Sequence, residues 1–88
     1  MEITDIRVRP VRTGGRMRAA VSVVFDGAFA VHDIKLIQGP DRLFLAMPAR
    51  RTPDGVSRDI VHPIRQELRD RLERSILEVY HNLPRDTR

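Results

Sequence analysis

The fold is decided by residues 16–37, which form the sequence RMRAAVSVVFDGAFAVHDIKLI. In the first half of this stretch the odd-numbered residues are apolar, as in a strand with one buried face: Met17, Ala19, Val21, Val23 and Phe25. Asp26-Gly27 is typical of a type I′ turn, which joins two antiparallel strands. The sequence therefore predicts a central hairpin, with its second strand over residues 28–37.

A further strand is predicted over residues 2–9, ahead of this hairpin. Ile6 and Val8 point to one face of that strand and Ile3 points to the other, because side chains alternate along a strand. Pro10 ends the strand, since proline has no backbone N–H to donate. Residues 2–9 thus extend the hairpin into an antiparallel sheet.

The chain after the hairpin holds one more strand and a basic loop. Residues 43–47 are all apolar and predict a short fourth strand. Residues 48–59 predict a loop whose tight turn lies at residues 52–55, Thr-Pro-Asp-Gly. Ile60 and Val61 are interpreted as a short edge strand. Residues 1–62 therefore supply a sheet of four to five strands.

An amphipathic helix is predicted over residues 63–83. Pro63 suits the first helical position, and Pro84 ends the pattern. Apolar side chains recur every three or four residues and form one stripe: Leu68, Leu72, Ile76, Val79 and Leu83. Residues 84–88 are expected to be a frayed tail. Strands followed by one helix predict a single α+β domain, with the helix packed on the antiparallel sheet.

The composition limits the classes of protein to which the chain can belong. Its 88 residues allow one domain, and 16 basic against 12 acidic residues give a net charge of +4. Cysteine is absent, which excludes disulfides and thiolate metal sites. No apolar run approaches the ~20 residues of a membrane span, and the N-terminus lacks the apolar core of a signal peptide. A cytoplasmic protein without a membrane anchor is expected.

Arginine supplies nearly all of the positive charge, because Lys35 is the single lysine. Arginine binds phosphate through two parallel hydrogen bonds and stacks on bases, which suits a nucleic-acid partner. A GC-rich genome, which favours arginine codons, explains the same ratio of arginine to lysine. The placement of the arginines is therefore more informative than their number.

One face of the predicted sheet collects positive charge. When the apolar residues of the first two strands share a face, the opposite face carries Arg7, Arg9, Arg16 and Arg18. A two-residue Asp26-Gly27 turn adds Lys35 to that face, opposite Arg18. Facing like charges destabilise a sheet, so such a stripe favours the binding of an anion. A phosphate-contacting stripe, a solvated face and a dimer interface with acids from the partner all remain open.

The same face is predicted to carry two acids and three apolar residues. Asp5 and Asp33 lower its net charge, whereas Val24, Phe29 and Val31 add apolar surface. Both faces of the sheet then have apolar side chains to bury, and a chain this short has few other sources of stability. We therefore expect a homodimer, with these apolar residues or residues 43–47 at its contact.

Three arginines lie in the predicted loop at residues 48–59. Arg50 and Arg51 are adjacent, Arg58 lies at the far end, and Asp54 and Asp59 accompany them. Adjacent arginines on an exposed loop can straddle a phosphate backbone. A solvated loop with no ligand is the simpler interpretation of the same residues.

The helical arginines divide into two pairs. Arg71 and Arg74 follow Glu67 and Asp70 by four residues, the favourable order for a helical ion pair, and are interpreted as structural. The other two have no acid four residues earlier and are the helical cations most available to a partner: Arg65 and Arg69. The alternative is that Arg65 extends into solvent from the first turn. Arg69 would then lay its aliphatic stem along the helix and keep its charged end in water.

No catalytic or metal-binding pattern is present. His32, His62 and His81 are far apart and lack metal-ligand spacing. His32 and Asp33 are predicted to point to opposite faces of their strand. The serines lack a nucleophile motif. We therefore expect no enzymatic activity, no metal and no cofactor.

Four blocks of the sequence resemble one known family. They are GRMRAAVSVVFD (15–26), AVHDIKLIQG (30–39), LFLAMPARRTPDG (43–55) and SRDIVHPI (57–64). These blocks are similar to the SpoVG family, the stage V sporulation protein G or septation proteins. The most specific part is the TPDG turn, preceded by a basic pair and followed by RDI-x-HP. Residues 65–88 match in character only, as a charged amphipathic helix.

The resemblance implies a small bacterial cytoplasmic protein that works as a homodimer, takes part in septation and sporulation control, and binds DNA and RNA. The family's basic pair falls on Arg50 and Arg51, with arginine at residue 50 where lysine is usual. Ala49, Ser57 and Pro10 also depart from the family pattern. A second hypothesis is a protein-interaction module that docks an acidic partner of the division machinery without binding nucleic acid.

Overall fold

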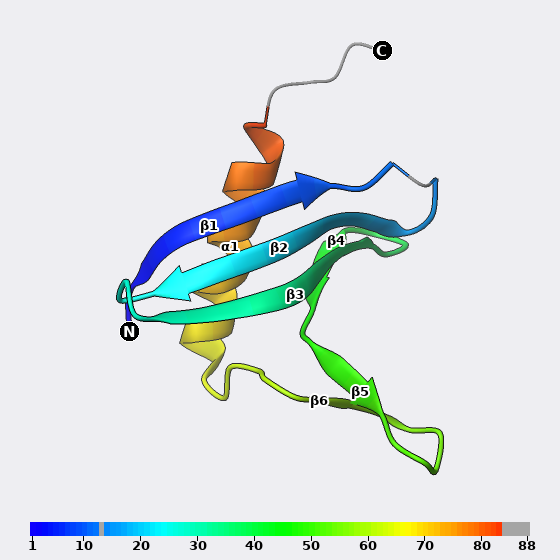
Figure 1. Cartoon of the computed structure of the whole chain (residues 1–88). Helices are drawn as coiled ribbons and strands as arrows, with labels where there is room; N and C mark the ends of the chain where they lie inside the picture. The colour runs from blue at the N-terminus through cyan, green and yellow to red at the C-terminus, as the bar shows by residue number, and fades with distance from the viewer. Residues whose placement is uncertain (13, 84–88) are drawn as a thin grey trace.

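Four antiparallel strands form the main sheet, in the order β1-β2-β3-β4 (Figure 1). The computed structural model describes residues 1–12 and 14–83, so the expected tail at residues 84–88 lies outside the described residues. The elements are β1 (Ile3–Pro10), β2 (Met17–Phe25), β3 (Phe29–Gln38), β4 (Leu43–Ala46), β5 (Ala49–Arg51), β6 (Ser57–Asp59) and α1 (Gln66–His81). Strands β5 and β6 form a separate two-stranded ribbon. The predicted α+β class is confirmed.

The hydrophobic core lies between the main sheet and α1, which crosses behind the sheet in Figure 1. Leu72 and Ile76 form the buried face of α1. The sheet and the residue after β4 bury the rest: Ala19, Val21, Val23, Phe25, Val31, Ile34, Leu36, Leu45 and Met47. Met17, predicted to share the buried face of β2, is only half-buried and lies outside the core. Each large apolar side chain buried here stabilises the fold by about 1.5–3 kcal/mol.

The faces of β1 follow the predicted alternation at Ile6 and Val8. Both residues lie opposite buried valines of β2 and pack against the core. The register shifts between Ile3 and Asp5, and Ile3 packs against the core as well. The prediction that Ile3 points to the opposite face is therefore wrong.

The β2–β3 hairpin has the predicted turn with a different register. Asp26 and Gly27 adopt φ angles of 54° and 60°, as a type I′ turn requires. The Ala28 N–H donates to the Phe25 carbonyl oxygen at 2.9 Å, which closes the turn. Strand β3 nevertheless begins one residue later, with Phe29 directly opposite Phe25.

This offset of one residue reverses the faces at the start of β3. Val31 lies opposite Val23 and is buried in the core. Phe29 lies on the same side and lines a cavity together with Phe25. The prediction that Phe29 and Val31 lie on the charged face, together with Val24, is therefore wrong: both lie on the opposite face.

A bulge in β3 places two residues, His32 and Asp33, opposite the single residue Ser22. Asp33 adopts a left-handed φ of 66° at this point. His32 and Asp33 are both exposed, and the Ser22 hydroxyl lies 2.8 Å from Nδ1 of His32. The predicted alternation of His32 and Asp33 across the strand is wrong, because the extra residue interrupts it.

The segment after β4 differs most from the prediction. Residues 48–59 were expected to be a loop, and they contain the two paired strands β5 and β6. Ile60 and Val61 lie outside any strand, so the predicted edge strand is wrong.

The helix α1 is shorter than predicted at both ends. It begins at Gln66, after Arg65 in an extended conformation with φ −114° and ψ 136°, and it ends at His81. Residues 63–65 and 82–83 therefore lie outside it. In residues 1–12 and 14–83, no helix combines the length and apolar character needed to cross a membrane.

Candidate functional site

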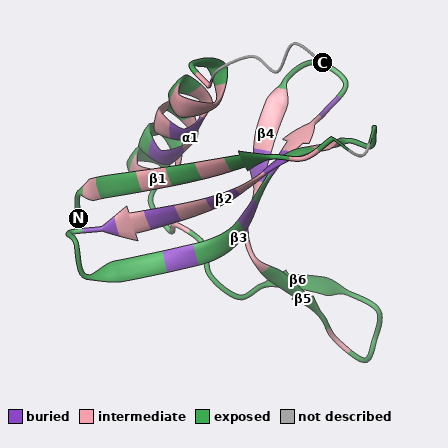
Figure 2. Ribbon diagram, turned by 45° about the horizontal axis from the view of Figure 1, so that its top comes forward, coloured by how far each residue is buried: buried purple, intermediate pink, exposed green. Residues whose placement is uncertain are grey.

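The β5–β6 ribbon stands away from the rest of the molecule (Figures 1 and 2). Every residue of its two strands is exposed. The Ile60 N–H donates to the Pro48 carbonyl oxygen at 2.7 Å and closes the base of the ribbon. A ligand can therefore approach the ribbon from both of its faces.

A hydrogen-bonded turn at residues 52–56 forms the tip of the ribbon. The Thr52 N–H donates to the Val56 carbonyl oxygen at 2.9 Å, and the Gly55 N–H donates to the Thr52 carbonyl oxygen at 2.8 Å. Gly55 adopts a φ of 85°, a conformation that glycine accepts without steric cost. The turn holds β5 and β6 in a fixed register.

Asp54 organises this turn through its carboxylate. It accepts a hydrogen bond from the Thr52 hydroxyl and one of 3.2 Å from the Val56 N–H. These bonds, the one from Thr52 first, lower the pKa of Asp54 below its ordinary value. The second carboxylate oxygen lies 3.8 Å from Nη2 of Arg58, so the turn also contacts β6 through a surface ion pair.

Arg50 and Arg58 lie directly opposite each other in the ribbon, and Arg51 lies opposite Ser57. Because side chains alternate, Arg50 and Arg58 share one face and Arg51 belongs to the other. Within the described part of the chain, no carboxylate lies within ion-pair distance of Arg50 or Arg51. Facing cations repel each other, so an anion bound between Arg50 and Arg58 relieves that repulsion.

The sequence predicted these three arginines as site residues but not their arrangement. Arg50 and Arg51 were expected to act as an adjacent pair on a loop, and strand geometry turns them to opposite faces. The signal for the actual pairing is the spacing, since Arg50 and Arg58 are each four residues from Asp54. A hairpin centred on Asp54 brings them opposite each other.

Three of the predicted stripe residues lie on the exposed face of the main sheet: Arg7, Arg9 and Lys35. Arg9 and Lys35 flank Ala20, because one is its partner in β1 and the other its partner in β3. The predicted pairing of Lys35 with Arg18 is wrong, because the turn and the bulge shift the register of β3. Arg18 itself is exposed at an irregularity in β2.

Acids and backbone groups occupy part of this stripe. Nε of Arg7 lies 3.1 Å from Oδ2 of Asp5. Asp33 lines a recess of about 400 Å³ together with Arg7 and Arg9. Arg16 lies before β2, where its Nε donates to the Gln38 carbonyl oxygen at 3.4 Å. The face therefore carries mixed charge, whereas Arg50 of the ribbon has no acid within ion-pair distance among the described residues.

The two helical cations singled out from the sequence both have acids nearby. Nε of Arg65 lies 3.5 Å from Oε1 of Glu67, and both side chains are largely exposed. Arg69 is half-buried and lines a recess beside β4 together with Asp70 and Glu73. These arginines are less available to an outside anion than their spacing predicts.

The polar contacts of α1 differ from the ion pairs predicted by spacing. Nη2 of Arg71 donates to the Met1 carbonyl oxygen at 3.0 Å and ties the helix to the N-terminus. Asp70 accepts a hydrogen bond of 2.8 Å from the Gln66 amide. Two predicted pairs are wrong, because neither forms among the described residues: Glu67–Arg71 and Asp70–Arg74.

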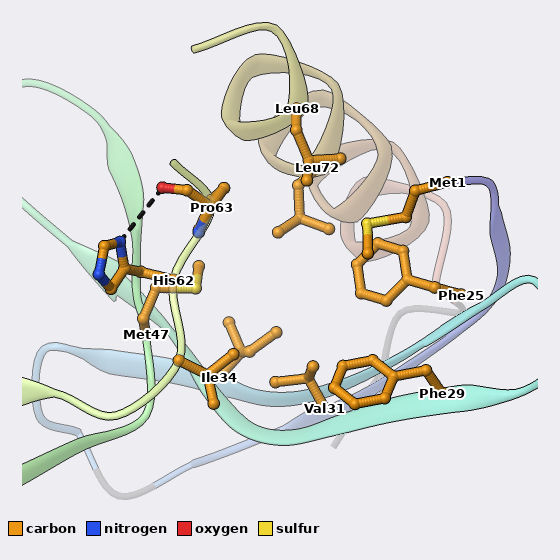
Figure 3. A pocket seen from close by; sticks show the side chains of 11 residues that line it. Met1, Phe25, Phe29, Val31, Ile34, Met47, His62, Pro63, Leu68 and Leu72 are labelled. Carbon is orange, nitrogen blue, oxygen red and sulfur yellow. Dashed lines mark hydrogen bonds between the residues drawn. The ribbon is translucent and has the colours of Figure 1, made fainter. Parts of the chain in front are cut away.

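An apolar groove opens between the main sheet and the start of α1 (Figure 3). Its cavity of about 90 Å³ is lined by Met1, Phe25, Phe29, Val31, Ile34, Met47, Val61, His62, Pro63, Leu68 and Leu72. Phe29 remains 56% exposed at this groove, and Ile64, next to the lining residue Pro63, is 89% exposed. The groove therefore leaves apolar side chains in contact with solvent.

The three histidines make separate local contacts. His32 contacts Ser22, and Nδ1 of His62 lies 3.2 Å from the Pro63 carbonyl oxygen (Figure 3). The His81 ring packs edge-on against Tyr80. In residues 1–12 and 14–83, no group of three His, Cys, Asp or Glu side chains is placed to hold a metal ion.

The ribbon and the groove both lie in a segment that matches a known family. The model of the SpoVG family matches residues 1–82. The chain belongs to the SpoVG family. The resemblance carried by the four sequence blocks is thus confirmed.

Three relatives of this SpoVG-family chain carry the name "Putative septation protein SpoVG". The one from Caldicellulosiruptor saccharolyticus is 52% identical over 80 residues, which cover 91% of this chain and 91% of the relative. The one from Desulforudis audaxviator is 54% identical over 82 residues, 93% of each chain. The one from Priestia megaterium is 53% identical over 83 residues, 94% of this chain and 86% of the relative. The similarity therefore extends over nearly the whole length of all four chains.

Proposed function

We propose that this SpoVG-family chain is a non-enzymatic, cytoplasmic regulator of septation and sporulation that binds nucleic acid as a homodimer. One observation carries the binding proposal. Arg50 and Arg58 face each other on an exposed ribbon, and Arg50 has no acidic partner among the described residues. Such a pair is stabilised by a phosphate group, which accepts bidentate hydrogen bonds from guanidinium groups. The proposed septation role is supported by the names of the relatives.

The other cations rank below the ribbon pair in the proposed interface. Arg51 comes next, because it is exposed on the opposite face of the ribbon and has no acid within ion-pair distance in the described residues. Arg7, Arg9 and Lys35 share their face with acids and contribute less. Arg65 and Arg69 rank last. Arg65 lies 3.5 Å from Glu67, closer than the 3.8 Å between Arg58 and Asp54, and Arg69 is half-buried in a recess with Asp70 and Glu73.

The apolar groove is the proposed contact between two copies of the chain. A symmetric dimer needs a surface that is complementary to itself, with projections and recesses on the same face. Phe29 and Ile64 are exposed apolar side chains beside a cavity of about 90 Å³, so one copy can fill the groove of the other. Two residues that the sequence analysis also offers for the dimer contact, Val31 and Met47, line the same cavity.

A protein-interaction module is the second candidate function. The facing arginines also suit the carboxylates of an acidic partner of the division machinery. Salt dependence separates the two candidate partners, nucleic acid and an acidic protein. Duplex nucleic acid of any sequence releases condensed counterions when bound, so its affinity falls log-linearly with salt.

Fluorescence anisotropy with labelled duplexes of unrelated sequence tests the proposal. Three phosphate contacts from the ribbon correspond to a slope of about 2.7, or about a 40-fold loss of affinity between about 50 and 200 mM salt. Binding with such a slope, similar for each duplex, supports the nucleic-acid function. Absence of binding to every nucleic acid, with saturable binding to an acidic protein, favours the second candidate.

A further inference from the structure

We infer that the β5–β6 ribbon binds in the major groove of B-form duplex DNA. The inference rests on the proposed function, because it names the class of nucleic acid and the groove that the same arginines contact. It follows from the shape of the ribbon, from the distribution of its charges and from the absence of aromatic side chains on it.

The width of the ribbon fits one groove only. Two paired strands lie about 4.8 Å apart, so with their side chains they match the major groove of B-DNA, which is about 12 Å wide. The minor groove, about 6 Å wide, is too narrow for a ribbon with arginine side chains. The major groove of A-form RNA is deep and narrow, and side chains do not enter it.

The ribbon is also long enough to reach the floor of that groove. Each strand has three paired residues, which span about 10 Å at about 3.4 Å per residue, and the turn at residues 52–56 extends further. The major groove is about 8.5 Å deep. The ribbon stands clear of the main sheet and of α1 in Figures 1 and 2, so the body of the molecule does not block its entry.

The charges of the ribbon suit a groove with phosphates on both sides. Arg50 and Arg58 lie on one face, and Arg51 lies on the other. With the tip toward the base pairs, Arg50 and Arg58 face the phosphate backbone on one side of the groove. Arg51, on the opposite face of the ribbon, then faces the backbone on the other side.

Single strands fit the ribbon poorly. Proteins that bind single-stranded nucleic acid stack its bases on aromatic side chains. Residues 49–59 contain no aromatic residue. The ribbon can attract the backbone of a single strand, but it offers no platform for the bases.

Four probes of one mixed sequence test the inference at a single salt concentration: duplex DNA, duplex RNA, single-stranded DNA and single-stranded RNA. We expect duplex DNA to bind at least 10-fold more tightly than each of the others. A duplex whose major groove is filled by glucosylated hydroxymethylcytosine should lose at least 10-fold in affinity, whereas netropsin in the minor groove should leave affinity unchanged.

Two double variants, each lacking two arginines, make the test specific to the ribbon. Arg50→Ala/Arg58→Ala should abolish the preference for duplex DNA. The control is Arg42→Ala/Arg74→Ala, which removes two cations outside the ribbon and should retain the preference. Thermal melts followed by circular dichroism establish that both variants are folded.

Two results would overturn the inference, and they differ in what they say about the proposed function. Equal or tighter binding of RNA or single strands, still weakened by Arg50→Ala/Arg58→Ala, contradicts the major-groove mode and leaves nucleic-acid binding in place. Failure to bind any of the four probes removes the proposed function together with the inference.

Discussion

Nη2 of Arg58 lies 3.8 Å from the Asp54 carboxylate, whereas Arg50, directly opposite Arg58, has no acid within ion-pair distance among the described residues. One member of the facing pair is thus held by the turn, and the other is available to a ligand. An exposed ion pair of this length contributes little to stability, so Arg58 can exchange Asp54 for a phosphate at low cost.

Reversing the charge of Arg50 separates the stability of the ribbon from its binding. Arg50→Glu replaces two facing cations with an opposite-charge pair, which should stabilise the ribbon by about 0.2–1 kcal/mol and slow the exchange of its amide hydrogens. Affinity for duplex DNA should fall, because the same change repels phosphate. Arg51→Glu is the matched control: it faces Ser57 and should weaken binding without slowing exchange. Faster amide-hydrogen exchange in Arg50→Glu would show that the side chains of residues 50 and 58 do not interact across the ribbon.

The carboxyl group of Asp54 should titrate below its ordinary pKa of 3.8. The Thr52 hydroxyl and the Val56 N–H favour the charged form, so the folded pKa lies below the unfolded one. The stabilisation that Asp54 gives to the turn is therefore complete above the unfolded pKa and is lost as the pH falls through the folded value. Carboxyl-carbon NMR measures this titration. Thr52→Val should raise the pKa of Asp54 toward 3.8, and an unchanged titration in that variant would contradict the assigned cause.

Asp33 should tolerate glycine and reject a β-branched residue. Its φ of 66° is a left-handed conformation that glycine adopts freely and valine strongly disfavours. Asp33→Val should destabilise the fold by about 1–2 kcal/mol, and Asp33→Gly should change stability by less than about 1 kcal/mol. Urea unfolding measures both. Lys35→Val is the control, since Lys35 is an exposed residue of the same strand with no positive φ; equal losses in the two valine variants would contradict the bulge.

Acidic substitutions in the apolar groove should dissociate the proposed dimer. Phe29→Glu and Ile64→Glu place a charge on surface that a second copy must cover, which burial strongly disfavours. Sedimentation of the unaltered chain should give about twice the 10.1 kDa mass, and each variant should approach 10.1 kDa. Val56→Glu, at an apolar residue of the ribbon tip that is 46% exposed, should leave the dimer intact. A monomeric unaltered chain would refute the contact.

The central strand and the helix stripe were predictable because their periodicity is strong. The alternation from Ala19 to Phe25 and the recurrence of Leu72 and Ile76 both mark the core. The faces of β3 were not predictable, because they depend on single extra residues at Ala28 and at the His32–Asp33 bulge. Each of these reverses the side-chain direction, and hydrophobic periodicity does not locate a bulge in advance.

The residues of the candidate site were predictable from the sequence, but their arrangement on the two faces of the ribbon was not. The basic pair and the TPDG turn are visible in the sequence, as is Arg58. Only the pairing of β5 with β6 brings Arg50 and Arg58 to one face and sends Arg51 to the other. A segment this short and polar carries no hydrophobic pattern to mark its strands.

The salt dependence of duplex binding in Arg50→Ala/Arg58→Ala tests the central claim most directly. Each neutralised phosphate contributes about 0.9 to the slope of log affinity against log salt, so losing both arginines should flatten the slope by about 1–2 units. The melting temperature should be nearly unchanged, because exposed substitutions shift stability by about 0.5 kcal/mol or less. A slope equal to that of the unaltered chain, in a variant that melts normally, would contradict the assignment of the ribbon as the nucleic-acid site.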